Sequence, residues 1–164
     1  MLRSPARDDA ATLARLGSDR RIADSMISLP HPFTPADAAQ WVESVTGADD
    51  RRGFCILDGA EVAGVAELRD IDRVHRQAEV SFWIGVSAWG KGLASRALGA
   101  VVEEAFGDAA INRLYAYHMV RNPASGRVMA KAKFQLEGTL RQRVYKNGVF
   151  EDVHLWGLLR GDRR

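Results

Sequence analysis

Apolar residues recur at helical spacing in four segments of the chain. The segment 8–16 ends at Gly17, and 34–45 opens with a threonine, a proline and an aspartate in an order typical of a helix start. In 93–105 the apolar residues follow the i, i+3, i+4, i+7 rule, with charged residues opposite, so this is the clearest helix. An asparagine and a proline open 122–132 and predict an N-cap and a first helical turn.

Strands are predicted where apolar and polar residues alternate, or where apolar runs are bounded by turn residues. These segments are 54–57, 62–68, 78–86, 114–120, 134–145 and 149–159. Gly59 permits a turn between the first two, and the Asn147-Gly148 step favours a two-residue hairpin turn between the last two. Both faces of 78–86 are substantially apolar, so we expect a central strand there.

This order of helices and strands predicts one mixed α/β domain spanning residues 1–164. Hydrophobic residues make up 46% of the chain and charged residues 27%, which excludes the low-hydrophobicity composition of a disordered protein. No internal repeat, low-complexity tract or interdomain linker is present in the sequence.

Charge and cysteine content exclude several classes of partner and site. The 23 basic and 21 acidic residues give a net charge of +2, too small to attract nucleic acid by bulk charge. Cys55 is the only cysteine, so an intrachain disulfide and a multi-thiolate metal site are excluded, and a reducing, cytoplasmic setting fits. The four histidines are scattered singly, and no metal site is expected. No apolar run approaches the roughly 18 residues of a membrane span, and the N-terminus has no apolar signal core.

Two glycines stand where the central strand leads into the clearest helix, in Gly90-Lys91-Gly92. Glycines let consecutive backbone N–H groups converge, and a helix N-terminus favours negative charge, so this junction is suited to a pyrophosphate. An ordinary glycine-containing helix start is the alternative. The chain has neither G-x-x-x-x-G-K-[ST] nor G-x-G-x-x-G, which excludes two other phosphate-binding motifs.

Four motifs in order carry a resemblance over essentially the whole chain. They are Trp89-Gly90-Lys91-Gly92-Leu93-Ala94, Asn122-x-x-Ser125-x-x-Val128, Phe134-x-x-Glu137-Gly138-x-x-Arg141 and Gly148-x-x-x-Asp152. The sequence resembles the GNAT superfamily of acyl-CoA-dependent N-acetyltransferases, and within it the ribosomal-protein (RimJ/RimL-like) branch.

The resemblance implies a mixed, mostly antiparallel sheet of seven strands, with a short first strand near 1–4 and about four flanking helices. The sheet would be splayed between its fourth and fifth strands, and acetyl-CoA would insert at the splay. No metal is implied. The residues expected to bind acetyl-CoA are Ile84, Val86, Trp89, Gly90, Lys91, Gly92, Leu93, Ala94, Ser95, Asn122 and Ser125.

The resemblance also implies direct attack of an amine on the thioester, with no covalent enzyme intermediate. A backbone N–H near Ile84 would stabilise the oxyanion. Ser125 is the expected proton donor to the departing thiolate, although a residue of this type at a helix start also bonds its own backbone. Glu79 is the expected base for the ammonium of the acceptor, with Glu67 as the alternative, and either can instead be a solvated or ion-paired strand residue. Cys55 is expected to be a buried core residue rather than a nucleophile.

The predicted function is acetyl transfer from acetyl-CoA to a primary amine, with a protein N-terminal α-amine as the leading acceptor. An amino acid, a polyamine or an antibiotic is the alternative acceptor within the class. A non-catalytic acyl-CoA-binding module is the alternative outside it. A homodimer is expected only by analogy with such families.

Overall fold

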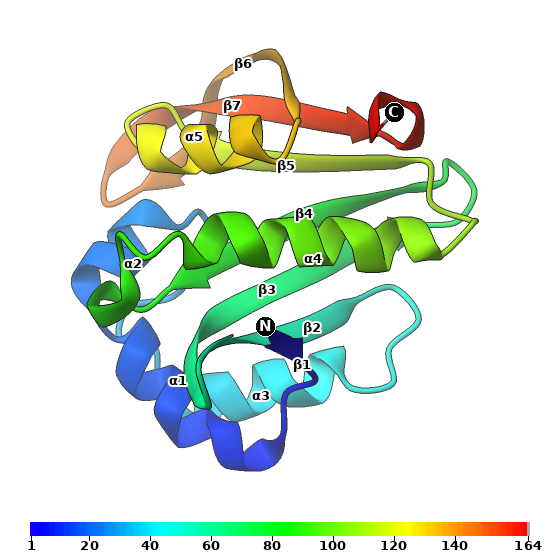
Figure 1. Ribbon diagram of the computed structural model, residues 1–164. Coiled ribbons are helices and arrows are strands. Elements are labelled where there is room, and N and C mark those ends of the chain that lie inside the picture. The colour runs from blue at the N-terminus through cyan, green and yellow to red at the C-terminus, as the bar shows by residue number, and fades with distance from the viewer. Residues whose placement is uncertain (164) are drawn as a thin grey trace.

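A computed structural model describes residues 1–163, and its seven strands form one sheet in the order β1-β2-β3-β4-β5-β7-β6 (Figure 1). The strands are β1 (Leu2–Arg3), β2 (Arg52–Asp58), β3 (Glu61–Asp72), β4 (Gln77–Ile84), β5 (Arg113–Met119), β6 (Gln135–Lys146) and β7 (Val149–Leu159). Neighbouring strands are antiparallel except β4 and β5, which are parallel. The predicted mixed, mostly antiparallel seven-stranded sheet is confirmed, with β4 at its centre.

Among residues 1–163, five α-helices flank the sheet: α1 (Ala10–Gly17), α2 (Arg20–Ser25), α3 (Pro35–Val45), α4 (Leu93–Gly107) and α5 (Pro123–Lys131). The sequence predicts four of them and misses α2. That helix has six residues and buries only Ile22 and Ala23, too few positions to show a period. Its one local signal is Asp19, whose side chain accepts the backbone N–H of Arg21 at 3.0 Å.

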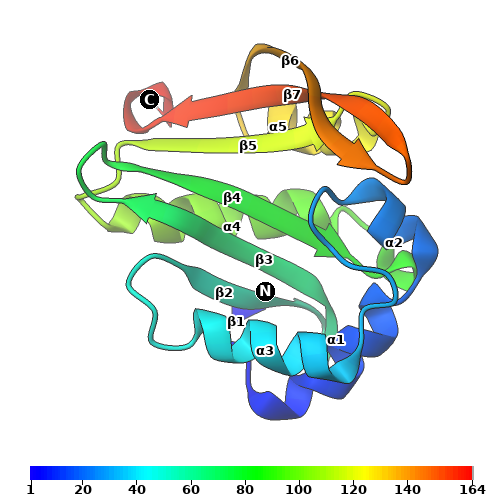
Figure 2. The same cartoon turned by 180° about the vertical axis from the view of Figure 1, so that it is seen from behind.

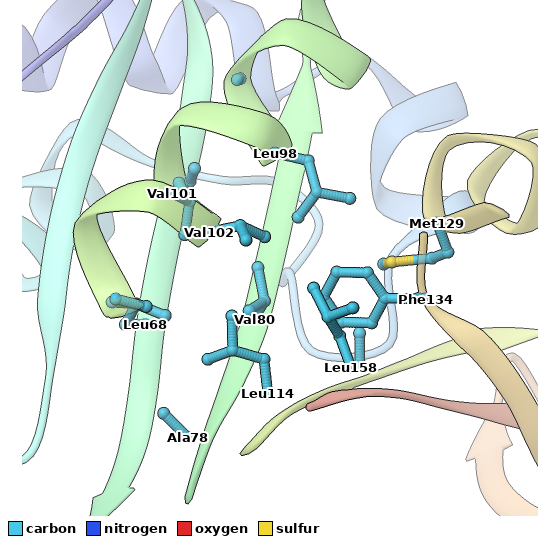
Figure 3. Packing of buried hydrophobic residues seen from close by; sticks show 14 of the residues in the cluster. Leu68, Ala78, Val80, Leu98, Val101, Val102, Leu114, Met129, Phe134 and Leu158 are labelled. Carbon is cyan, nitrogen blue, oxygen red and sulfur yellow. The ribbon is translucent and has the colours of Figure 1, made fainter. Parts of the chain in front are cut away.

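The helices lie on two faces of the sheet, α4 and α5 on one (Figure 1) and α1 and α3 on the other (Figure 2). Successive side chains of a strand point to opposite faces, so β4 contributes to two separate cores. Val80 and Ile84 pack in the core beneath α4, and Trp83 packs in the core beneath α1 and α3. Figure 3 shows the first core, in which Val80 lies near Val101 and Val102 of α4.

Local signals explain most element boundaries. At the start of α3, Thr34 and Asp37 form the reciprocal capping box that the sequence indicates. Asn147 and Gly148 have φ values of 52° and 80°, and they connect β6 to β7 as the predicted two-residue turn. The fourth strand ends at Ile84, earlier than predicted, because 86–88 form a short 3₁₀ turn.

Candidate acetyl-CoA and acceptor site

The two central strands separate part of the way along the sheet. Strands β4 and β5 pair only at 77–79 and 113–115, and beyond these residues no strand pairing joins them (Figure 2). The predicted splay between the fourth and fifth strands is therefore present. Backbone groups at the far ends of both strands are left free to bind something other than a neighbouring strand.

The end of β4 presents backbone groups to this opening. The Gly85 N–H donates to the carbonyl oxygen of Ala63 at 2.7 Å, which makes Gly64 and Ile84 a non-hydrogen-bonded pair. The N–H and C=O of Ile84 therefore point away from β3, toward the side of β5. The indole Nε1–H of Trp89 donates to the Ile84 carbonyl oxygen at 2.7 Å, so the Ile84 N–H is the group left available.

The turn before α4 has the backbone conformation that its glycines permit. Gly90 and Gly92 have φ values of 76° and 72°, and Gly92 is the N-cap of α4 in the left-handed region. The first intrahelical bond runs from the Arg96 N–H to the Gly92 carbonyl oxygen, so the N–H groups of the preceding turn have no acceptor inside the helix. The Arg96 guanidinium also holds the loop, donating to the Lys91 carbonyl oxygen at 3.0 Å.

A cavity of about 550 Å³ opens at this point, and we call it the α4–α5 cavity. Nine of the eleven residues expected to bind the cofactor line it: Ile84, Trp89, Gly90, Gly92, Leu93, Ala94, Ser95, Asn122 and Ser125. Val86 and Lys91 do not. Val86 packs against the core beneath α1 and α3, and the Lys91 ammonium lies 2.7 Å from a carboxylate oxygen of Asp58.

The sequence analysis misses two cations of this cavity, Arg127 and Lys131 on α5. They are four residues apart and therefore lie on one side of the helix. Their spacing is visible in the sequence, but which face of α5 meets the cavity depends on how the helix packs.

Asn122 and Ser125 are in direct contact. The Asn122 Nδ2 donates to the Ser125 Oγ at 3.0 Å and to the Ser25 carbonyl oxygen at 3.3 Å. Asn122 occupies the N-cap position of α5 and Pro123 follows it, as predicted, but the Asn122 side chain makes no capping hydrogen bond. The amide instead connects α5 to the end of α2 and fixes one lone pair of the serine hydroxyl.

A second cavity of about 380 Å³, the α3 cavity, lies against the other face of the sheet. Leu13, Leu29, Phe33, Val65 and Trp83 form most of its apolar wall. Glu67 also lines it. The Glu67 carboxylate accepts the indole N–H of Trp41 at 3.1 Å and lies 3.8 Å from the Arg51 guanidinium.

A small cavity of about 30 Å³, the junction cavity, lies where the strands separate. It shares Phe82 and Ser125 with the α4–α5 cavity, and Ser28 and Ser81 with the α3 cavity. The splay thus brings together residues that face opposite sides of the sheet. Ser125 lines the junction cavity and the α4–α5 cavity, whereas Met26 and Trp83 line both of the larger cavities.

Glu79 lines the junction cavity, is 8% exposed, and forms an ion pair with Arg69. Arg69 also donates to the Ser28 hydroxyl at 3.3 Å. The two residues lie directly opposite each other on β3 and β4. Arg69 is not predicted as a site residue, because it lies one residue beyond the predicted strand 62–68 and its pairing with Glu79 follows only from the strand register.

Two further findings concern metals and membranes. The described residues contain no cluster of three or more His, Cys, Asp or Glu side chains that is able to hold a metal ion. Within residues 1–163, none of the helices combines the length and apolar character needed to cross a bilayer.

Comparison with known proteins identifies the class. Residues 1–135 match the family model of the acetyltransferase (GNAT) domain, so the chain belongs to the GNAT family of acetyltransferases. It is an acetyl-CoA-dependent N-acetyltransferase.

Three relatives illustrate the range of the match. The uncharacterized N-acetyltransferase p20 of Bacillus licheniformis is 29% identical over 165 residues, which cover 97% of this chain and 92% of that protein. The ribosomal-protein-serine acetyltransferase of Escherichia coli (strain K12) is 31% identical over 103 residues, 63% of this chain and 58% of that protein. The structure of spermidine N-acetyltransferase from Vibrio cholerae in complex with CoA and spermine has a TM-score of 0.88 at 23% identity, over 99% of this chain and 96% of that chain. This last match shows a shared fold.

Proposed function

We propose that the enzyme acetylates the α-amino group at the N-terminus of a protein, with acetyl-CoA in the α4–α5 cavity and the acceptor in the α3 cavity. A cytoplasmic location fits a reaction of this kind. The observation that carries the choice of acceptor is the charge of the α3 cavity, whose two carboxylates are matched by two arginines.

Two carboxylates line the α3 cavity, and two arginines line it with them. Asp37 accepts the backbone N–H and the hydroxyl of Thr34 at 2.8 and 2.6 Å, and Glu67 is held by Trp41 and Arg51. A polyamine carries further ammonium groups besides the reacting one, and each needs a carboxylate when it leaves water. An N-terminal residue brings one ammonium and a side chain, which suits the apolar wall of this cavity. This favours a peptide over a polyamine.

Three features support the assignment of acetyl-CoA to the α4–α5 cavity. The free N–H groups around Gly92 suit the pyrophosphate, and Arg127 and Lys131 supply positive charge at the same cavity. The unpaired backbone at the end of β4 suits the amide groups of the pantetheine arm. Asn122 then lies beside Ser125, where the thioester would end.

The reaction we infer uses three groups at the meeting point of the cavities. Glu79, directly or through a water, takes the proton of the ammonium, and the free amine attacks the thioester carbonyl. The Ile84 N–H, which points into the splay, stabilises the oxyanion. The Ser125 hydroxyl protonates the thiolate as it leaves. Glu67 is the alternative base. It lines the α3 cavity, whereas Glu79 and Ser125 both line the junction cavity.

The test measures thiol release from acetyl-CoA with three acceptors: a peptide with a free N-terminus, the same peptide with a blocked N-terminus, and spermidine. Isothermal calorimetry with acetyl-CoA is run beside it. We expect turnover with the free peptide and none with the blocked peptide. A higher kcat/KM for spermidine than for the peptide would contradict the acceptor assignment. Cofactor binding without turnover on any amine would favour a non-catalytic acyl-CoA-binding module.

A further inference from the structure

His118 is a buried histidine that the reaction above does not use. It lies on β5 and is 4% exposed. Its Nδ1 is 2.8 Å from the carbonyl oxygen of Met119, and a carbonyl oxygen only accepts hydrogen bonds, so Nδ1 carries the proton. In the neutral ring Nε2 then has a free lone pair and acts as an acceptor.

The Nε2 atom has no hydrogen-bond partner among residues 1–163, although it is fully buried. Burial lowers the pKa of His118 and outweighs the hydrogen bond to the Met119 carbonyl, which raises it, and the nearby His154 adds a smaller lowering. The ring is therefore neutral at pH 7. A buried acceptor without a donor is costly, which indicates that a mobile donor satisfies it.

Gly126 of α5 faces the Nε2 atom of His118. A side chain at Gly126 would place its Cβ 3.0 Å from Nε2, so the glycine of α5 keeps this side of the ring clear. Ser125 precedes that glycine, and both Ser125 and His118 line the junction cavity. Its volume of about 30 Å³ exceeds the ~10–15 Å³ that one water needs. A water in this cavity would have two polar partners, His118 Nε2 and Ser125 Oγ, as a buried water requires.

We propose that His118 is a positioning residue that orients the Ser125 hydroxyl through one bridging water. The water donates one hydrogen to His118 Nε2 and the other to Ser125 Oγ. Because Asn122 Nδ2 already donates to the same oxygen at 3.0 Å, both serine lone pairs are then occupied. The hydroxyl proton of Ser125 is left to point at the sulfur. This inference rests on the proposed function, since it concerns the same proton transfer.

The proton balance closes within this chain of groups. After attack, the acceptor nitrogen carries one proton more than the amide retains. As the C–S bond breaks, the thiolate takes the hydroxyl proton of Ser125, and Ser125 takes a proton from the water. The water is restored by the extra proton of the nitrogen. His118 gains and loses nothing in this step, and it acts only by fixing the direction in which the water donates.

Protonation of His118 would reverse the hydrogen bond between the ring and the bridging water, because Nε2–H would then donate to the water. Several titratable or charged groups surround the ring. The His154 ring of β7 has its centroid 5.3 Å away, and Glu79, Arg69 and Tyr117 line the same junction cavity. Glu79 and Arg69 compensate each other in an ion pair, and α5 contributes only uncharged residues there. We therefore expect kcat to fall in acid with an inflection below the ordinary pKa of histidine.

Two substitutions separate this role from a structural one. His118→Leu removes the acceptor, and His118→Gln retains an acceptor oxygen that does not titrate. We expect kcat to fall about tenfold in the leucine variant, less than the loss of a proton-transfer group itself, because His118 acts only through the water, and we expect acetyl-CoA affinity to be unchanged. The glutamine variant should recover most of kcat and lose the acid inflection. A kcat of His118→Leu within twofold of the wild type, or an acid inflection that persists in His118→Gln, would overturn the proposal.

Two matched controls use the neighbours of His118 on β7. His154→Gln makes the same change at the cross-strand partner, and Trp156→Phe removes a buried indole N–H that has no partner among the described residues. We expect both to keep kcat and the acid inflection of the wild type. If Trp156→Phe abolished the inflection, the water would join His118 to Trp156 rather than to Ser125, and the proposal would be wrong.

A final measurement needs no acceptor and so separates this inference from the proposed function. Long-range ¹H–¹⁵N spectra of the imidazole in the free protein report which ring nitrogen carries the proton. We expect the Nδ1–H form at pH 7, with Nε2 unprotonated. An Nε2–H form would overturn the role of His118 even in an enzyme active on peptides. Failure of every amine in the acceptor panel would contradict the proposed function, while the spectra would still decide the state of the ring.

Discussion

At the scale of single residues, Ser125 is defined by what its hydroxyl contacts. The Oγ accepts from the Asn122 side chain, and no hydrogen bond from this hydroxyl to the backbone is found among residues 1–163. The alternative role, in which the serine bonds its own backbone, therefore has no contact to support it. The Ser125 hydroxyl therefore belongs to a residue that lines both the α4–α5 cavity and the junction cavity.

Ser125→Ala should slow turnover roughly ten- to a hundredfold, mostly in kcat, because the hydroxyl acts on the thiolate in the transition state and a thiolate is already a good leaving group. Acetyl-CoA affinity and the melting temperature should change little. Steady-state rates, calorimetry and thermal unfolding on this one variant are the measurements. A loss of stability with kcat intact would remove Ser125 from the reaction.

Glu79→Gln should lower turnover most at moderate pH, with partial recovery in alkaline buffer, where the acceptor already arrives as the free amine. It should also lower the melting temperature, because Arg69 is left buried without its carboxylate. The pH dependence of kcat is the readout, and Glu67→Gln is the matched control on the neighbouring strand. If the control variant instead shows the alkaline recovery, Glu67 is the base.

At the scale of elements, α4 connects the sequence motif to the cofactor site. The helix begins at Leu93 immediately after a left-handed glycine, so its first free N–H groups face the α4–α5 cavity. Helix start, cavity and loop all depend on the φ of 72° at Gly92. A residue with a branched Cβ adopts this conformation only with strain.

Gly92→Val should weaken acetyl-CoA binding at least tenfold, because the loop must shift and bulk is added where backbone would approach the phosphates. Gly99→Val is the control: Gly99 lies in the same helix, and a Cβ there meets nothing within 4 Å. Calorimetry with acetyl-CoA on both variants, with circular dichroism to verify folding, is the measurement. Equal affinities for the two folded variants would contradict the assignment of the loop.

The elements also show which features the sequence can predict. Long segments with a clear period, such as α4 and the β6–β7 hairpin, are predictable because many residues repeat one signal. Helix α2 is not predictable in this way, and neither is the pairing of Arg69 with Glu79, because strand register depends on tertiary contacts. The role of His118 is not predictable for the same reason, because the sequence of its strand does not show that Gly126 lies beside the ring. The splay itself was expected only from the family resemblance.

At the scale of the whole molecule, the edge strand β1 is tied to the first turn by a partly buried ion pair. Arg3 donates to both carboxylate oxygens of Asp9 at 2.8 and 2.7 Å, and the Ala6 N–H donates to the same carboxylate at 2.7 Å. The hydrogen bonds from Arg3 lower the pKa of Asp9 to about 2, despite the opposing effect of burial. The free energy that this shift contributes to folding is complete above the ordinary pKa of an aspartate and is lost as the pH falls toward 2.

Wild-type protein should therefore lose stability between about pH 4 and 2, and Asp9→Asn should lose less over the same range. At pH 6 the variant should be less stable by roughly 1–3 kcal/mol, because Arg3 keeps only a neutral partner. Denaturant unfolding of both proteins at pH 6, 4 and 2.5 is the measurement. A constant stability difference at all three pH values would show that Asp9 does not carry this dependence.

The junction cavity has a kinetic consequence. The α4–α5 cavity and the α3 cavity are separate but share Met26 and Trp83 in their walls, and the junction cavity of about 30 Å³ adjoins both beside Ser125. Acetyl-CoA and the acceptor can therefore be bound at the same time. The proposed reaction also has no acetyl-enzyme intermediate, because the amine attacks the thioester directly. Initial-rate plots against one substrate, at several fixed levels of the other, should therefore give lines that intersect rather than run parallel. A single molecule in which the acceptor is joined to the cofactor sulfur through a short linker should occupy both sites at once and inhibit competitively against each.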